Sequence, residues 1–160
     1  ALGIAGALMG WFEVLERFHG FTVLACMASS DVFSAGASLY GVADLSALAT
    51  DTHKFEARYL DRLVGPWPEA GEIYEARSPI HHLDEFDHPL IVFQGLDDRV
   101  VPPSQSEMIV DALRDKGVAC EYHVYEGEGH GFRKAETIVH QLTQELAFYV
   151  SVLGLGEVGS

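Results

Sequence analysis

The sequence predicts an α/β fold in which a mostly parallel sheet is flanked by helices. Strand-like and helix-like segments alternate along the 160 residues, and such alternation is typical of parallel sheets covered by helices. The clearest strand is the apolar run PLIVFQG at residues 89–95, bounded by Pro89 and Gly95, as expected of a parallel strand buried on both faces. With 48% apolar and 21% charged residues, the chain has the composition and length of one globular domain with a substantial core.

Three elements and a connector are expected before that strand. They are a mostly buried helix at 20–29, a short buried strand at 33–41 and a helix at 52–65 that ends at Gly65-Pro66. The helix at 52–65 places its apolar residues on one face, namely Phe55, Tyr59, Leu60 and Leu63. The connector at 67–89 is rich in loop-forming residues and has room for one or two short helices.

Three elements follow that strand. Ser104 and Glu107 have the spacing of a capping box that opens a helix, and Gly117 closes it. Residues 120–126 alternate as a strand. A last helix at about 134–153 carries an apolar stripe that we expect to face the core, formed by Ile138, Val139, Leu142, Leu146 and Val150.

Charge and composition exclude several classes of protein. Ten Lys and Arg against 24 Asp and Glu give a net charge of −14, so we expect the chain to bind neither nucleic acid nor an anionic membrane. Cys26 and Cys120 lie in apolar stretches, which favours buried free thiols over a disulfide and predicts a reducing, cytoplasmic location.

The first residues are unusual. The stretch ALGIAGALMGWF is apolar for only about a dozen residues, short of the ~20 needed to span a bilayer, and it lacks the basic start of a signal peptide. We expect a core or interface helix, or a segment of foreign origin. Because the chain does not begin with Met, a processed or truncated product is also expected.

Three strand ends carry the residues suited to chemistry: YGVADL, GLDDRVVP and EGEGHGF. In parallel sheets the carboxyl ends of the strands meet at one edge, where active sites gather. The second of these segments contains Asp97 and Asp98, and the third contains His130. We therefore expect an aspartate and His130 to lie close together at this edge.

His130 and Asp98 are the candidate catalytic residues. Histidine titrates near neutral pH, as a general base requires, and flanking glycines let the backbone expose its side chain. A histidine base needs a carboxylate to fix its tautomer and to stabilise the imidazolium. Asp98, three residues past Gly95, is well placed for this, and Asp97 is its close rival. The alternative is that Asp98 caps a turn and His130 is an ordinary loop residue.

Three segments resemble a known family when taken together: residues 33–66, residues 78–117, from SPIHHLDEF to LRDKG, and residues 125–138, YEGEGHGFRKAETI. They resemble the C-terminal catalytic region of the prolyl oligopeptidase family, and most closely its acylaminoacyl-peptidase and dipeptidyl-aminopeptidase-like branch. The resemblance covers about residues 20–152. It implies a partial α/β-hydrolase fold without the family's early strands, and a serine peptidase mechanism. Asp98 and His130 fall at the acid and base positions.

The family's nucleophile motif, Gly-x-Ser-x-Gly-Gly, is not visible in this chain. It precedes the helix that matches residues 20–29 and lifts a serine hydroxyl above the sheet. When Gly20 is aligned with the last glycine of the motif, Arg17 stands at the serine position and His19 at a glycine position. Arginine is always protonated, and an imidazole would obstruct the turn, so neither residue performs that role.

Other candidate residues are weaker. Ser38 lies within a predicted strand, Ser29 and Ser30 close a helix, and Cys26 is a mid-helix thiol that needs an electropositive pocket to react. The run HHLDEFDH at 81–88 contains ligand-type residues, but its spacing fits no closed tetrahedral zinc site. We interpret it as a solvated connector. Tyr40 and Trp67 are candidates to line a substrate pocket or simply to pack.

The sequence therefore predicts a serine hydrolase that cleaves peptide or ester bonds by acyl transfer, with Asp98 and His130 as catalytic residues and with no metal or other cofactor. The alternatives are a catalytically incomplete scaffold or oligomerising remnant, and an esterase using an unrecognised serine. We expect a homo-oligomer formed through an exposed sheet edge or the apolar N-terminal segment. The expected domain division is an atypical segment at 1–19, the catalytic region at 20–153 and a tail at 154–160.

Overall fold

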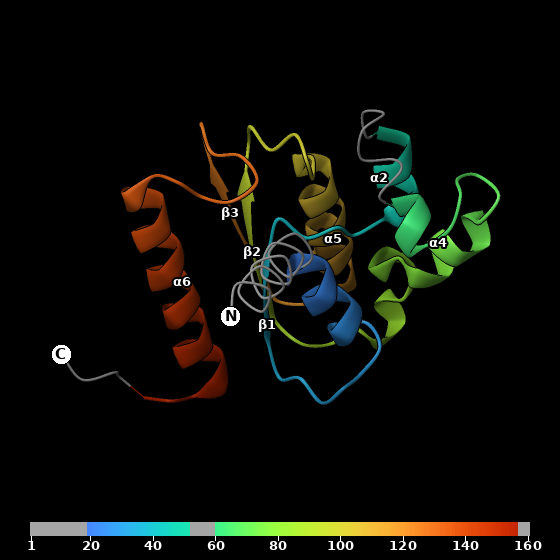
Figure 1. Ribbon diagram of the computed structural model, residues 1–160. Helices are drawn as coiled ribbons and strands as arrows, with labels where there is room; N and C mark the ends of the chain where they lie inside the picture. The colour runs from blue at the N-terminus through green and yellow to red at the C-terminus, as the bar shows by residue number, and fades with distance from the viewer. Residues whose placement is uncertain (1–18, 52–59, 157–160) are drawn as a thin grey trace, which may run out of the picture.

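The computed structural model describes residues 19–51 and 60–156. These residues form a parallel three-stranded sheet with strand order β1-β2-β3 (Figure 1). The strands are β1 (Gly36–Leu39), β2 (Leu90–Gly95) and β3 (Cys120–Tyr125). Both pairings are parallel, so all three carboxyl ends lie at the same edge. The predicted α/β fold with a parallel sheet is confirmed.

The central strand β2 is buried along its whole length. Side chains of a strand alternate between the two faces of the sheet, and both faces of β2 carry large apolar residues. Leu90 and Val92 belong to one core cluster, whereas Ile91 and Phe93 belong to another. A strand with two buried faces has no polar side, which explains why the segment reads as a continuous apolar run.

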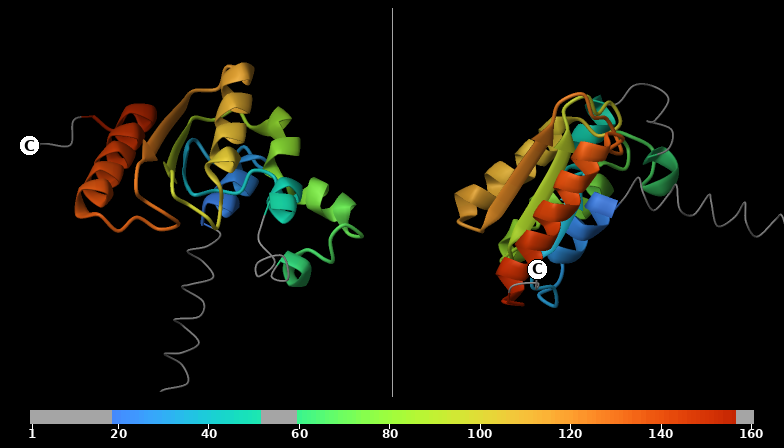
Figure 2. Two further views of the ribbon diagram at one scale, coloured as in Figure 1. Left: turned by 90° about the horizontal axis from the view of Figure 1, so that it is seen from above. Right: turned by 90° about the vertical axis from the view of Figure 1, so that its left-hand side faces the viewer.

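Helices cover both faces of the sheet, with more helices on one face than on the other (Figures 1 and 2). The helix at 19–27 and α5 (Pro103–Lys116) pack on one face through Leu24, Ile109 and Leu113. α6 (Ala135–Leu153) covers the opposite face, where Phe148 contacts Ile91 and Phe93. The described part of the fold is therefore a helix–sheet–helix arrangement in three layers.

A group of short helices lies beside the layer formed by α5 and helix 19–27. It contains α2 (Leu45–Asp51), α4 (Gly71–Arg77) and the 3₁₀ turns η1 (Pro79–His81) and η2 (Leu83–Glu85). The connector was expected to hold one or two short helices, and α4 with its two 3₁₀ turns confirms this. α2 was not predicted from the sequence; its first amides, those of Ser46 and Ala47, donate to Asp44 Oδ1 at 2.7 and 3.1 Å.

Helix 19–27 approaches the end of β1 very closely. A Cβ added to Gly20 would clash with the backbone of Gly41 and Leu39. This close packing explains why a glycine stands at a helical position, although glycine generally weakens a helix.

Gly20→Ala is therefore expected to lower the free energy of unfolding by about 1–3 kcal/mol, because the added methyl group overpacks a contact between backbones. Chemical denaturation measures the effect. Gly71→Ala is the matched control, since the nearest atom to its added Cβ would be a Trp67 ring carbon at 3.7 Å. Equal effects of the two substitutions would contradict the close approach.

Two predictions about helices are wrong. The predicted capping box of Ser104 and Glu107 is not formed: α5 begins at Pro103 after Pro102, and no side chain caps it. Proline suits the first turn because its missing N–H has no helical partner there. Most of the apolar stripe of α6 does not face the core: Val150 is half-buried, but Ile138, Val139, Leu142 and Leu146 are 38–63% exposed while Thr137, Gln141 and Phe148 are buried.

Other boundaries differ from the predicted ones. The strand predicted at 33–41 is reduced to Gly36–Leu39. Of the helix predicted at 52–65, the structure describes residues 60–63 as helical, with Leu60 buried and Leu63 exposed. The apolar segment 1–15 and residues Phe55 and Tyr59 lie outside the described residues. No helix in the described ranges has the length and apolar character needed to cross a membrane.

Candidate active site

The loops that follow the three strands meet at the carboxyl edge of the sheet, as predicted. The Asp97 amide in the β2 loop donates to Glu128 O in the β3 loop at 2.9 Å. The amide of Phe132 in the same β3 loop donates to the hydroxyl of Tyr40, which follows β1, at 3.3 Å. Segments distant in the sequence are therefore fastened to one another at this edge.

Asp98 is a buried carboxylate with a complete set of partners. It is 4% exposed, and Oδ1 accepts the amides of Val100 and Val101 at 2.8 and 2.9 Å. Oδ2 lies 2.9 Å from Nδ1 of His130. A carboxylate in this position acts as an acceptor, so the His130 ring donates through its Nδ1–H. The predicted contact between Asp98 and His130 is present, whereas the rival Asp97 is exposed.

His130 is held by a loop rich in glycine. Gly127 and Gly131 have φ values of +68° and +88°, a conformation that residues with a side chain rarely adopt. These turns present the ring to Asp98 through Nδ1. The other ring nitrogen, Nε2, is buried and has no hydrogen-bond partner among the described residues. With Nδ1 protonated, Nε2 carries the lone pair that accepts a proton in general-base catalysis.

Tyr40 forms one wall of the site. Its ring centroid lies 5.0 Å from that of His130 and 4.9 Å from that of Phe132. Its φ of +50° is the only positive value among the described residues other than glycine, and such outliers are found mainly where surrounding contacts impose them. That Tyr40 lines a substrate pocket stays a prediction, and the ring of Trp67 packs edge-on against that of Tyr74.

The buried side-chain amide of Gln94 in β2 contacts the loop that carries Asp98. Gln94, the polar residue in the otherwise apolar strand β2, donates through Nε2 to Val101 O at 3.2 Å and approaches Asp98 Oδ2 at 3.5 Å. Its Oε1 accepts the Ser106 hydroxyl of α5 at 2.7 Å. Neither Gln94 nor Ser106 was predicted from the sequence. A polar residue within a buried strand was the available signal, because such groups persist only when hydrogen-bonded.

Glu128 is a second buried carboxylate that the sequence analysis missed. It is 2% exposed. Burial raises the pKa of its carboxyl, but hydrogen bonds from the Arg133 and Lys134 amides and the Thr137 side chain, with the Lys134 charge, outweigh burial and leave the pKa below its ordinary value of 4.5. Glu128 is therefore ionised at neutral pH.

This lowered pKa predicts a pH-dependent contribution to stability. A group whose folded-state pKa is depressed stabilises the fold fully above its unfolded pKa and loses that contribution as the pH falls through the folded value. We expect the difference in Tm between the wild type and Glu128→Gln to be constant from pH 7 down to about 4.5 and to shrink below it. Thermal unfolding across this range measures the difference, and a difference that grows on acidification would contradict the prediction.

The candidate nucleophiles considered from sequence do not reach His130 through any hydrogen bond in the described residues. Ser38 is 1% exposed and donates to Gly20 O at 3.5 Å. Ser29 donates to Ala25 O within its own helix. Cys26 and Cys120 are free thiols and are half-buried rather than fully buried, and burial raises the pKa of Cys120 to about 11. Arg17 lies outside the described residues.

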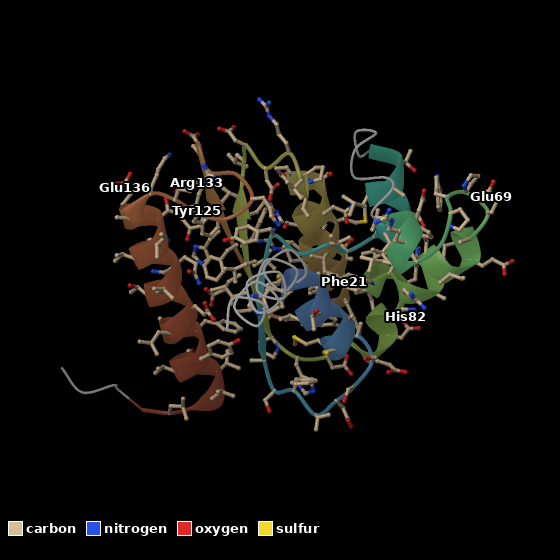
Figure 3. The ribbon with its side chains drawn as sticks, in the orientation of Figure 1. Phe21, Glu69, His82, Tyr125, Arg133 and Glu136 are labelled. Atoms are coloured by element: carbon tan, nitrogen blue, oxygen red, sulfur yellow. The ribbon has the colours of Figure 1, made fainter. Side chains whose placement is uncertain are left out.

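The histidine-rich connector at residues 81–88 lies beside helix 19–27, apart from the Asp98–His130 pair. His81, His82 and Asp84 are exposed and line a cavity of about 600 Å³ together with Phe21 and Ala25 of helix 19–27. Figure 3 shows Phe21 and His82 on one side of the molecule, and Tyr125 and Arg133 near the start of α6 on the other. Within the described ranges, no cluster of three or more His, Cys, Asp or Glu side chains is arranged to hold a metal ion.

Comparison with known proteins shows what the chain resembles. The family model of the prolyl oligopeptidase family, Peptidase_S9, matches residues 19–156. The dipeptidyl aminopeptidase BIII of Pseudoxanthomonas mexicana is 28% identical over 125 residues, which cover 74% of this chain and 18% of that protein.

Solved structures give a consistent result. A Mycobacterium tuberculosis puromycin-hydrolyzing peptidase is 49% identical with a TM-score of 0.81, over 84% of this chain and 20% of that chain. The acylaminoacyl peptidase of Pyrococcus horikoshii, at 21% identity and a TM-score of 0.77 over 88% of this chain and 23% of that one, supports the fold alone. The chain spans about a fifth of the length of these relatives. The predicted partial α/β-hydrolase fold is confirmed, and the chain belongs to the prolyl oligopeptidase family.

Proposed function

We propose that this chain contributes the acid and the base of a serine-hydrolase active site that cleaves peptide or ester bonds by acyl transfer. The observation that carries the proposal is the 2.9 Å hydrogen bond between Asp98 Oδ2 and His130 Nδ1, together with the buried and unpartnered Nε2. An ordinary loop histidine has neither a buried carboxylate on one nitrogen nor a sequestered lone pair on the other.

The roles follow from this geometry. Nε2 of His130 accepts the proton of a serine hydroxyl as the oxygen attacks the substrate carbonyl, and the imidazolium then protonates the leaving amine or alkoxide. Asp98 stabilises the imidazolium and fixes the tautomer. Water, deprotonated by the same nitrogen, releases the acyl group and restores the serine.

The relatives favour a particular class of substrate. Two similar structures, at 49% and 43% identity, are a puromycin-hydrolyzing peptidase and a puromycin hydrolase, and two curated relatives are a dipeptidyl aminopeptidase and a dipeptidyl peptidase family member. We therefore propose that the site acts on short peptides or on aminoacyl amides of the puromycin type. A cytoplasmic location belongs to the same proposal, and the free thiols Cys26 and Cys120 support it.

A fluorophosphonate probe tests the proposal, because it reacts covalently with activated serines. We expect labelling of one serine, identified by peptide mass spectrometry, and loss of the label in His130→Ala. Circular dichroism confirms that the variant is folded. A folded wild-type protein that takes no label would contradict catalysis by this chain.

The second candidate function is assembly without catalysis, and the exposed apolar surface supports it. In the described fold β3 pairs with β2 alone, which leaves one of its edges open, and open edges and apolar patches promote association. Val139, Leu142 and Leu146 of α6 are exposed. Sedimentation equilibrium tests this function: a dimer that dissociates on Leu142→Glu supports it, and a stable monomer contradicts it.

A further inference from the structure

Glu128 joins three parts of the fold that together determine where His130 lies. Its carbonyl oxygen accepts the Asp97 amide at 2.9 Å, next to Asp98. A Cβ on Gly95, the last residue of β2, would clash with this same carbonyl, so the β3 loop rests directly on the end of the central strand. Glu128 is also only two residues from His130.

The Glu128 side chain points the other way, to the start of α6. Oε2 accepts the amide of Arg133 and Oε1 accepts the amide of Lys134, both at 2.9 Å, and the Thr137 side chain adds a third hydrogen bond. Lys134, the residue that precedes α6, offers no side-chain cap of its own. The carboxylate therefore takes the place of a cap, where the helix dipole favours a negative charge.

The loop around Glu128 and His130 has a backbone with many accessible conformations. Gly127, Gly129 and Gly131 surround Glu128 and His130, and glycine gains the most conformational entropy when a loop is released. A loop with three glycines holds a histidine at 2.9 Å from Asp98 only if it is fixed at both ends. The Glu128 carboxylate closes the end of the loop that faces α6, and burial makes it costly to leave unpaired.

We propose that Glu128 is a positioning residue: its carboxylate, bound to the amides of Arg133 and Lys134, locks the β3 loop so that His130 Nδ1 stays on Asp98. This inference rests on the proposed function, in which that pair is the acid–base couple. Glu128 itself touches no reacting atom. It acts through the backbone of the loop.

The test measures the exchange with water of the His130 ring Nδ1 proton by NMR, with the resonance assigned through its loss in His130→Ala. Glu128→Gln keeps the size of the side chain but turns an amide NH₂ toward a backbone N–H. We expect exchange about tenfold faster, the effect of losing roughly one charge-assisted hydrogen bond. Thr137→Val removes one partner and is expected to give about a threefold increase. Glu126→Gln, the same change at an exposed position of the same loop, is expected to leave exchange unchanged.

Each outcome decides a different claim. Faster exchange in Glu128→Gln and Thr137→Val, with wild-type exchange in Glu126→Gln, supports the positioning role. A lowered Tm in both variants with unchanged exchange of the His130 proton would show that Glu128 only caps α6, and would overturn the inference while leaving the proposed function intact. The lack of a hydrogen-bonded Nδ1 proton in the wild type would instead overturn the acid–base pair itself.

Discussion

A chain in which residues 15–20 are changed from LERFHG to the Gly-x-Ser-x-Gly-Gly pattern is expected to gain a fluorophosphonate reaction at residue 17, where the parent has Arg17. The substitutions are Leu15→Gly, Arg17→Ser and His19→Gly, and Gly20 already matches. Because the Asp98–His130 pair is already assembled, a serine placed at residue 17 in the family's motif is expected to gain a general base, which is worth about 100- to 10,000-fold in rate. Labelling kinetics followed by mass spectrometry measure the gain.

Two variants make this result specific. Adding His130→Ala to the altered chain should remove most of the labelling at residue 17, because the base is then lost. Keeping Arg17 while changing Leu15 and His19 should give no gain. Equal labelling rates in the altered chain with and without His130 would show that the pair does not serve a nucleophile at this turn.

The second large effect is expected at Asp98. In the altered chain, Asp98→Asn should cancel most of this gain, a loss of about 100- to 10,000-fold in the labelling rate, because an amide NH₂ facing Nδ1 forces the ring into the tautomer whose Nε2 carries a proton. The Asn carbonyl is still able to accept the Val100 and Val101 amides, so the loop should remain folded.

Asp97→Asn is the matched control for that experiment. Asp97 is the adjacent carboxylate, it is exposed, and its amide rather than its side chain binds the β3 loop. The rate should therefore change less than about threefold, as expected for a surface charge removed from a screened position. Similar losses in the two variants would mean that net charge, and not the contact with His130, controls reactivity.

The sequence was most informative where one physical requirement dominates. β2 is buried on both faces, which favours an apolar segment with Gln94 as its one polar side chain, and its position was predicted closely. The parallel sheet then placed Asp98 and His130 at one edge, and their contact followed. Gly117, with a φ of +83°, ends α5 as predicted, because few other residues adopt that conformation.

Predictions failed where several contacts compete. The apolar stripe of α6 has helical periodicity, but periodicity does not say which face meets the sheet, and Phe148, with the half-buried Tyr149 and Val152, makes the sheet contact. The capping box at Ser104 is a local pattern that is overridden because the helix starts at Pro103, two residues before the start that Ser104 as N-cap would give. The α2 helix depends on the Asp44 cap and on the Ser78 hydroxyl, which accepts the Leu45 amide at 2.9 Å from 33 residues away.

The supporting part of the site was not predictable for a related reason. Glu126 and Glu128 are chemically identical and lie two residues apart, yet one is exposed and the other is buried against α6. Gln94 acts on Asp98 only because α5 brings Ser106 to its carbonyl oxygen. These roles arise from tertiary contacts that no local pattern encodes.

The ring tautomer of His130, measured by ¹⁵N NMR on the neutral imidazole, tests the acid–base pair most directly. Nδ1 bound to the Asp98 carboxylate must carry the proton, so the account predicts the Nδ1–H tautomer, with Nε2 showing the shift of an unprotonated nitrogen, and its reversal in Asp98→Asn. A wild-type ring protonated at Nε2, unchanged by that substitution, would contradict it.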